Sequence, residues 1–363
     1  MRNNNMPKKD EYIYPHSPVE VIRQFNTQLL GVDATKLSIG LFDGKIGLCV
    51  YLMKQFQYTH EVCYEKKAEQ LLEDVYAAIS DCSGFAVENG LIGLGLGFVE
   101  LMESGAYEGN PNHILKDVDD RIYRHLSTLC SPSPASTAEQ IKELLWGSIY
   151  LCKRCVHAGL PKGEKVLFRR MIIRSINRLE TSLRDMLIAD PLVFAPLDYP
   201  MLVFLHLLRM VQEQGLYDYK IERLCRDWID YLAVLMPMSI GHRFLLGGVL
   251  GCLGERLSNT HVSTMLAKHS ALLRTNSDMD VFLNQELGSL CLPISVGVAG
   301  LWFVMRQSSW EIPPDLREKM IMRIESSEAF KACAKPKDSL QGIGLITGQA
   351  GVVLAYQQLK QAI

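Results

Sequence analysis

The feature that most constrains this chain is a glycine pair, Gly-x-x-Gly, which recurs along the sequence and each time opens an apolar segment. Five copies are clear, with leading glycines at Gly44, Gly90, Gly248, Gly297 and Gly348. Three of the intervals between these glycines are 46 (44 to 90), 49 (248 to 297) and 51 (297 to 348) residues. A near-constant interval of this kind is typical of repeat architectures, in which each copy is one supersecondary unit.

The remaining interval, 158 residues from 90 to 248, has room for two degenerate copies. We place them at Trp146-Gly147 and at Tyr199-Pro200, which lack the second glycine but begin apolar segments at the expected distances. Seven units then fill the chain.

Charged amphipathic segments lie between the glycine motifs. In residues 65–80 the apolar side chains recur at i, i+3, i+4 and i+7, the spacing of a helix buried on one side. Similar segments are residues 19–30, 113–128, 169–187, 220–235, 260–273 and 314–327. Each unit is therefore predicted to be an amphipathic outer helix followed by an apolar inner helix. We expect an all-α fold, an α/α toroid (barrel) of seven helical hairpins, in one domain over residues 19–363 after an N-terminal arm, residues 1–18.

Composition limits the environment and the partners. With 48% hydrophobic and 21% charged residues and a net charge of −2, the chain has a globular composition and no field to attract nucleic acid or an anionic membrane. The polar N-terminus lacks an export signal, and no apolar run reaches the ~20 residues that span a bilayer. We expect a cytoplasmic protein with free cysteine thiols and with neither nucleic acid nor membrane as a partner.

The start of each inner helix is the predicted binding region. Several helix N-termini would converge there and offer unpaired N–H groups to an anionic or carbonyl-rich ligand. For every single glycine, close packing alone is the alternative explanation. The predicted substrate-binding residues are Asp43, Gly44, Glu88, Gly90, Gly147, Gly248, Gly297 and Gly348.

The sevenfold register, together with the glycine-rich stretches at 89–98 and 342–351, resembles the lanthionine synthetase C-like (LanC-like) family. The resemblance implies an α/α toroid and a role in lanthipeptide-type peptide modification, with a peptide or a protein of the modification or export system as partner. In active members it also implies a zinc ion, which activates a peptide cysteine thiol for addition to dehydroalanine or dehydrobutyrine.

The zinc ligands implied by the resemblance are missing from this chain. The cysteine of the fifth unit falls on Leu246, and the Cys-His pair of the sixth falls on Ser295 and Val296. None of these side chains is a zinc donor, so we expect no cofactor. A displaced zinc site built from His242, Cys252 and Cys291 is the alternative.

Acid–base residues are the second part of the resemblance, which places an acid before the third motif and a histidine before the fourth. Glu143 matches the acid, and Asp198 and Tyr199 occupy the second region, so these three are the catalytic candidates. Asp43, Glu88, Glu143 and Asp198 would form an acidic ring, in which carboxylate pKa values can rise. Helix capping by Asp43, Asn89, Ser295 and Thr347 is the alternative role for the polar residues near the helix starts.

These observations favour a LanC-like protein that binds peptide without zinc, or a degenerate cyclase. A carbohydrate-active toroid using two carboxylates is an alternative, although four tryptophans are few for a sugar-binding groove. A non-catalytic adaptor is the third hypothesis.

Overall fold

The computed structural model describes residues 17–105, 111–131, 136–157, 159–186, 191–288, 291–307, 312–335 and 342–361. These residues form helices and connecting loops, with no β-strand among them. The first sixteen residues of the predicted N-terminal arm lie outside the described residues. Ser17 caps the first helix by accepting a hydrogen bond from the backbone N–H of Glu20.

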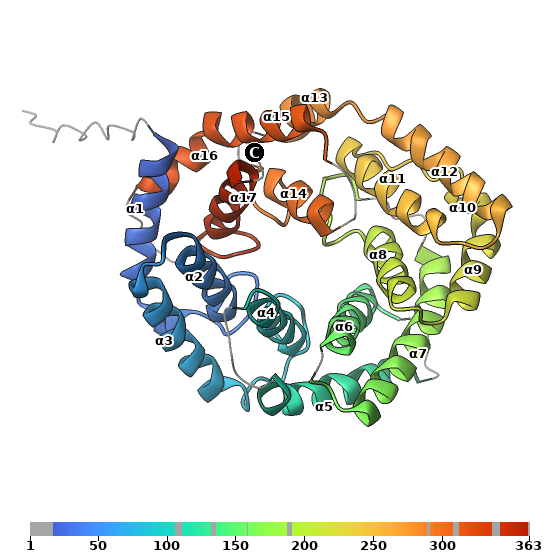
Figure 1. Cartoon of the computed structure of the whole chain (residues 1–363), viewed down its shortest axis with the longest axis horizontal. Coiled ribbons are helices and arrows are strands. Elements are labelled where there is room, and N and C mark those ends of the chain that lie inside the picture. The colour runs from blue at the N-terminus through green and yellow to red at the C-terminus, as the bar shows by residue number, and fades with distance from the viewer. Residues whose placement is uncertain are drawn as a thin grey trace, which may run out of the picture.

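The helices form two concentric rings (Figure 1). The inner ring consists of α2 (Lys45–Thr59), α4 (Leu91–Glu103), α6 (Ala138–Val156), α8 (Pro200–Glu213), α11 (Ile240–Glu255), α14 (Val298–Gln307) and α17 (Gln349–Gln361). The outer ring consists of α1 (Pro18–Leu30), α3 (Val62–Ala78), α5 (Pro111–Leu129), α7 (Lys162–Met186), α9 (Asp218–Asp227) with α10 (Ile229–Leu232), α12 (Thr260–Thr275), and α15 (Pro314–Ser326) with α16 (Glu328–Lys331). Short turns are η1 (Ala34–Lys36), α13 (Met279–Val281), η2 (Phe282–Glu286) and η3 (Ala332–Ala334).

Each inner helix packs against the next, and α17 returns to α2, which closes the ring. The predicted sevenfold α/α toroid is therefore confirmed. Because an outer helix precedes every inner helix, the seven inner helices run in one direction and begin at the same end of the ring. We call this end the N-terminal face.

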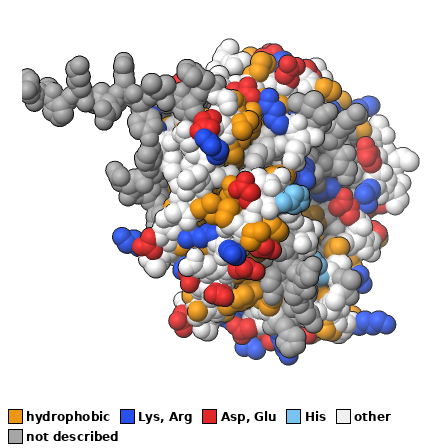
Figure 2. Space-filling model, turned by 60° about the vertical axis from the view of Figure 1, so that its left-hand side comes forward, with side chains coloured by type: hydrophobic (Ala, Val, Ile, Leu, Met, Phe, Trp, Pro, Cys, Tyr) orange, Lys and Arg blue, Asp and Glu red, His pale blue; other side chains and the backbone are white. Residues whose placement is uncertain are grey.

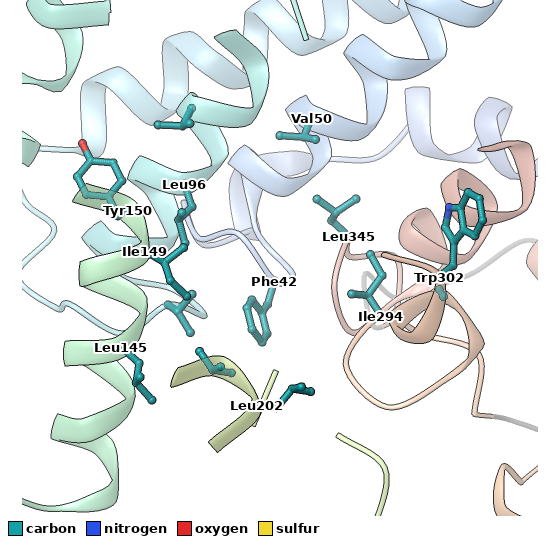
Figure 3. Packing of buried hydrophobic residues seen from close by; sticks show 14 of the residues in the cluster. Phe42, Val50, Leu96, Leu145, Ile149, Tyr150, Leu202, Ile294, Trp302 and Leu345 are labelled. Atoms are coloured by element: carbon teal, nitrogen blue, oxygen red, sulfur yellow. The ribbon is translucent and has the colours of Figure 1, made fainter. Parts of the chain in front are cut away.

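Burial explains why the two rings differ in sequence. Ten residues of α4 are buried, because neighbours surround this helix on all sides. In α3 only one stripe is buried, and it contains Ala68, Leu71, Leu72 and Val75. Apolar side chains from different units, including Phe42, Leu96, Ile149 and Ile294, belong to one buried core (Figure 3).

The outer surface carries both signs of charge. On the side seen in Figure 2, basic and acidic side chains are interspersed with scattered hydrophobic ones. This distribution fits the small net charge of −2. No described helix is both long enough and apolar enough to cross a membrane.

Two details differ from the sequence expectation. The outer segment predicted over residues 220–235 is interrupted at Trp228, whose backbone leaves helical geometry while its ring packs 5.6 Å from that of Phe204. The prediction that Gly147 and Gly248 open inner helices is wrong, because both lie inside their helices.

Polar caps explain the early starts of these two helices. Thr137 and Gln140 form a capping box that starts α6 at Ala138, and Ser239 caps α11 at Ile240. A Cβ on Gly147 would lie 2.8 Å from Leu126 of outer helix α5, so this glycine permits close packing between the rings.

Candidate functional site

Four units share one loop structure at the N-terminal face. In the loops before α2, α4, α14 and α17, backbone carbonyls accept hydrogen bonds from N–H groups seven residues further along the chain. The bonds run from Lys45 to Ser38, Ile46 to Ile39, Gly47 to Gly40, Leu91 to Gly84, Val298 to Cys291, Ala299 to Leu292, Gln349 to Gly342 and Ala350 to Ile343. The loops therefore fold back over the helix starts and satisfy N–H groups that a helix cannot satisfy itself.

This capping contradicts two expectations. The first N–H group of each of these four helices, together with the second in α2, α14 and α17, is not free to bind an anion, because a loop carbonyl already accepts its hydrogen bond. Side-chain capping by Asp43 or Asn89 is also wrong: the N-cap residues of α2 and α4 are Gly44 and Gly90, and neither helix has a side-chain cap.

The second glycine of each motif makes room for the loop. A Cβ on Gly47, Gly93, Gly300 or Gly351 would lie 1.9–2.1 Å from the carbonyl oxygen six residues earlier. No side chain can occupy that position without moving backbone, so the Gly-x-x-Gly pairs in these units are requirements of packing.

The same four loops are joined by a backbone ladder. Ser295 N–H donates to Ile346 O over 2.9 Å, Ile346 N–H to Phe42 O over 3.0 Å, and Phe42 N–H to Glu88 O over 3.1 Å. Each of these residues stands two positions before its leading glycine, at Gly297, Gly348, Gly44 and Gly90. The ladder thus runs through the sixth, seventh, first and second units in register.

Asp43 lies exposed on this ladder, where it accepts a hydrogen bond from the hydroxyl of Thr347. The amino group of Lys142, on α6, bridges the carboxylates of Glu88 and Asp198. Burial lowers the pKa of Lys142, but its hydrogen bonds to Asp198 and Glu88 outweigh this effect and raise the pKa above its ordinary value. Two of the expected ring carboxylates are therefore held together by a cation.

Glu143 faces the outer ring. Its Oε2 lies 2.8 Å from Nε2 of His125 on α5, and both side chains are largely buried. The His125 ring stacks on Phe85 with centroids 3.8 Å apart. The expected acidic ring of four is consequently divided into an exposed Asp43, the Lys142 bridge and a Glu143–His125 pair.

Tyr199 is 3% exposed and caps α8, with its ring 4.8 Å from that of His242. The α7–α8 loop, residues 191–199, crosses to the start of α11. There the N–H of Ala195 donates to Nε2 of His242 over 3.0 Å, and Phe194 packs 5.2 Å from the imidazole. Burial lowers the pKa of His242 to about 4, so the imidazole is neutral at pH 7.

The residues at the positions implied for zinc do not fit a metal. Leu246 is fully buried inside α11, Ser295 forms part of the ladder, and Val296 has no donor atom. The displaced alternative is not supported either, because ten residues of one helix place His242 and Cys252 ~15 Å apart. Among the described residues, no three His, Cys, Asp or Glu side chains are grouped to hold a metal ion.

The Cys152-x-x-Cys155 pair lies buried within α6. Burial raises the pKa of both thiols, that of Cys155 to about 11, which disfavours the reactive thiolate.

Sequence reasoning did not identify Lys142, His125 or Phe194. The carboxylate partners of Lys142 are 54 and 56 residues away in sequence, and the carboxylate partner of His125 is 18 residues away. The Lys142 bridge joins three different units of the ring, and the Glu143–His125 pair joins the two helices of one unit, so no pattern along the sequence signals either pairing.

Comparison with known proteins gives a fold relationship. No protein-family model matches the sequence, and no curated protein sequence matches it. Among solved structures, nisin cyclase is similar over 95% of this chain and 94% of its own, with a TM-score of 0.57 and 14% identity. At this identity the likeness establishes the fold alone: the chain has the helical toroid fold of nisin cyclase.

Proposed function

We propose that this protein is a LanC-like toroid that binds peptide at its N-terminal face and acts in lanthipeptide-type peptide modification without zinc. The observation that carries the proposal is the closed ring of seven units, which corresponds to nisin cyclase over nearly its full length. A peptide, presented alone or by a protein of the modification or export system, is the partner that this relationship favours.

The metal-free part of the proposal rests on the chemistry of the side chains. Leu246, Ser295 and Val296 supply no thiolate or imidazole. The nearby imidazole of His242 is committed to the backbone of Ala195 instead. Thiol activation by zinc therefore has no side chains to hold the ion, and we propose peptide binding or a degenerate cyclase activity.

Any acid–base activity would use the charged pairs described above. The Glu143 carboxylate and the His125 imidazole are placed to exchange a proton, and Asp198 is exposed at the N-terminal face. Buried Tyr199 is better suited to positioning, through its contact with His242. Under the adaptor hypothesis the protein would bind its partner in the same way, but Glu143, His125 and Asp198 would take no part in a reaction.

The carbohydrate-active alternative is not favoured. The carboxylates of half-buried Glu88 and exposed Asp198 are bridged by Lys142. Trp228 and Trp302 are buried, so neither offers a stacking face to a sugar. Trp310 lies outside the described residues.

The test uses a synthetic peptide containing one cysteine and one dehydroalanine. Binding to the full-length protein is measured by fluorescence anisotropy. After incubation, iodoacetamide labelling followed by mass spectrometry measures the thiol that remains. The metal content of protein purified without chelator is measured by inductively coupled plasma mass spectrometry.

We expect the peptide to bind, the thiol to remain open to alkylation, and zinc to be well below one per chain. Absence of binding would contradict the peptide-binding function. One zinc per chain together with loss of the free thiol would contradict the metal-free part and restore a cyclase.

A further inference from the structure

The outward face of helix α7 carries positive charge and exposed apolar side chains together. This helix belongs to the outer ring (Figure 1), and one of its faces, which includes Phe168, Ile172 and Leu179, is buried in the core. The exposed side chains on the opposite face are those of Lys162, Val166, Leu167, Arg170, Arg174, Asn177 and Thr181. None of them is acidic. Because α7 follows closely after the end of α6, this face begins at the end of the ring opposite to the N-terminal face.

Helix geometry places the first five of these side chains next to one another. Lys162, Val166, Arg170 and Arg174 follow at intervals of four residues, and Leu167 stands three residues before Arg170. Residues three or four apart are neighbours on a helix surface, and the whole run covers ~18 Å of helix. Val166 is 49% and Leu167 45% exposed, with cations one turn away on either side. We call these five residues the basic stripe.

The cations of the stripe are not engaged by carboxylates. Half-buried Lys165 and Arg169 flank the stripe, so residues 162–174 carry five positive charges against the single negative charge of Glu164. In the part of the chain that the structure describes, none of these five cations forms an ion pair. Arg174 donates one long hydrogen bond, 3.5 Å, to the hydroxyl of Ser127.

The neighbouring outer helices do not neutralise the stripe. The exposed charged residues of α5 balance one another and are Lys116, Asp117, Asp120 and Arg124. Those of α9 and its end are Asp218, Glu222, Arg223, Arg226 and Asp227, of which Asp227 lies near both arginines. Glu180, further along α7, is bonded to Lys220 of α9. A chain with a net charge of −2 therefore carries a local excess of positive charge on α7.

Charge complementarity makes the occupant acidic, and the two apolar side chains narrow its class. The sugar–phosphate backbone of a nucleic acid supplies negative charge but no apolar side chain to cover Val166 and Leu167. A helix that lies on a membrane inserts its apolar face into the lipid. The apolar face of α7 is instead buried in the ring, which leaves only two apolar side chains for lipid. A protein segment can supply carboxylates and apolar side chains at once.

We propose that the basic stripe docks a partner protein through an acidic segment, in which aspartate or glutamate flanks one or two apolar side chains. The carboxylates pair with Lys162, Arg170 and Arg174, and the apolar side chains cover Val166 and Leu167. This surface lies on the outer ring, apart from the N-terminal face. The inference therefore goes beyond the proposed function and does not rest on peptide binding there.

The experiment compares two labelled peptides of equal length, one of leucine and glutamate and one of leucine and lysine, by fluorescence anisotropy with the full-length protein. The first test variant is the double replacement Arg170→Glu with Arg174→Glu. Its matched control is Lys66→Glu with Lys268→Glu, which reverses two exposed cations on α3 and α12. Both variants change the net charge by the same amount, so only the position of the change differs.

The second test variant, Val166→Ser with Leu167→Ser, removes the apolar side chains of the stripe. Its matched control is Val62→Ser with Leu272→Ser, which removes one valine and one leucine that are 51% and 49% exposed on other outer helices. Circular dichroism establishes that each variant is folded.

We expect wild type to bind the glutamate peptide at least about tenfold more tightly than the lysine peptide. The Arg170/Arg174 variant should weaken binding of the glutamate peptide about tenfold at 50 mM NaCl and less at 500 mM, because salt screens exposed charges. The Val166/Leu167 variant should weaken it severalfold, because two apolar contacts are lost. Each control should change the affinity less than about twofold.

Equal binding of the two peptides, or unchanged binding by the Arg170/Arg174 variant, would refute the basic stripe. The cysteine–dehydroalanine peptide should bind this variant as tightly as it binds wild type, and its loss from the folded variant would contradict a separate surface. If that peptide failed to bind wild type while the glutamate peptide bound, the proposed function would fail and the stripe would stand. Binding of phosphatidylglycerol vesicles or duplex DNA that requires Arg170 and Arg174, without binding of the glutamate peptide, would overturn the assignment to a protein partner.

Discussion

Replacing Gly93 by alanine is expected to destabilise the protein even though alanine is the better helix former. Gly93 is the second glycine of the second unit and lies in the first turn of α4. A Cβ there would lie 1.9 Å from the carbonyl oxygen of Val87 and 3.2 Å from Cβ of Leu41. The obstacle is backbone, which cannot rotate away as a side chain can.

The loop that carries Val87 is tied down on both sides. Leu91 N–H bonds to Gly84 O over 3.0 Å, and Glu88 O accepts the ladder bond from Phe42 over 3.1 Å. Relieving the clash costs about 1–3 kcal/mol in overpacking and about 1 kcal/mol for each of these hydrogen bonds. The gain in helix propensity offsets about 1 kcal/mol. The net loss in the free energy of unfolding is then about 2–4 kcal/mol.

Urea unfolding followed by circular dichroism measures this loss. The matched control is Gly163→Ala on outer helix α7, where an added Cβ meets nothing within 4 Å. That variant should be unchanged or more stable by up to about 1 kcal/mol. If Gly93→Ala were as stable as the control, the argument that the loop carbonyl requires glycine would be refuted.

Four further outcomes are expected. The pKa of His242 is about 4 in the folded protein, against an ordinary value of 6.5. As the pH falls from 6.5 to 4, the unfolded chain therefore binds a proton at this histidine that the folded protein does not bind. The free energy of unfolding should fall by up to about 3 kcal/mol over this range. His242→Gln should remove that part of the pH dependence of urea unfolding. Asp119→Asn leaves the buried guanidinium of Arg154 without its carboxylate and should cost about 3–5 kcal/mol in the same assay, whereas replacing both partners by apolar residues should cost less. Lys142→Met should change the free energy of unfolding by no more than about 1 kcal/mol in the same assay, because the bridge is partly exposed. In a thiol-reactivity assay with Ellman's reagent, exposed Cys63 should react before the buried cysteines, and equal rates would contradict the burial argument.

The architecture followed from the sequence because repetition and periodicity are local signals. The interval between Gly44 and Gly90 gives the length of one repeat unit. The apolar stripe of residues 65–80 distinguishes the amphipathic outer helix from the apolar inner helix. Neither inference needs knowledge of long-range contacts. The same signal misplaced the starts of α6 and α11. There the Thr137–Gln140 capping box and the Ser239 cap determine where the helix begins, while Gly147 and Gly248 lie inside.

The candidate site depended on contacts between helices. Glu143 and Asp198 could be selected from the sequence as acids near helix starts. Only the packing of α5 against α6 shows that Glu143 pairs with His125, and only the packing of neighbouring units shows that Asp198 pairs with Lys142. The hydrogen bonds from the helix N–H groups to the loops could not be predicted from the sequence either. Their acceptors are backbone carbonyls, which every residue type carries.

The sequence by itself determined the sevenfold helical ring and the lack of donor side chains at Leu246, Ser295 and Val296, because residue identity and spacing are sufficient for both. Only the tertiary structure decided that the loops fold back over the helix starts, that Lys142 joins two carboxylates, and that the backbone ladder links Ser295, Ile346, Phe42 and Glu88. The capping bonds span only seven residues but depend on the path of the loop backbone, whereas the ladder and the Lys142 bridge depend on residues far apart in the chain that packing of the units brings together.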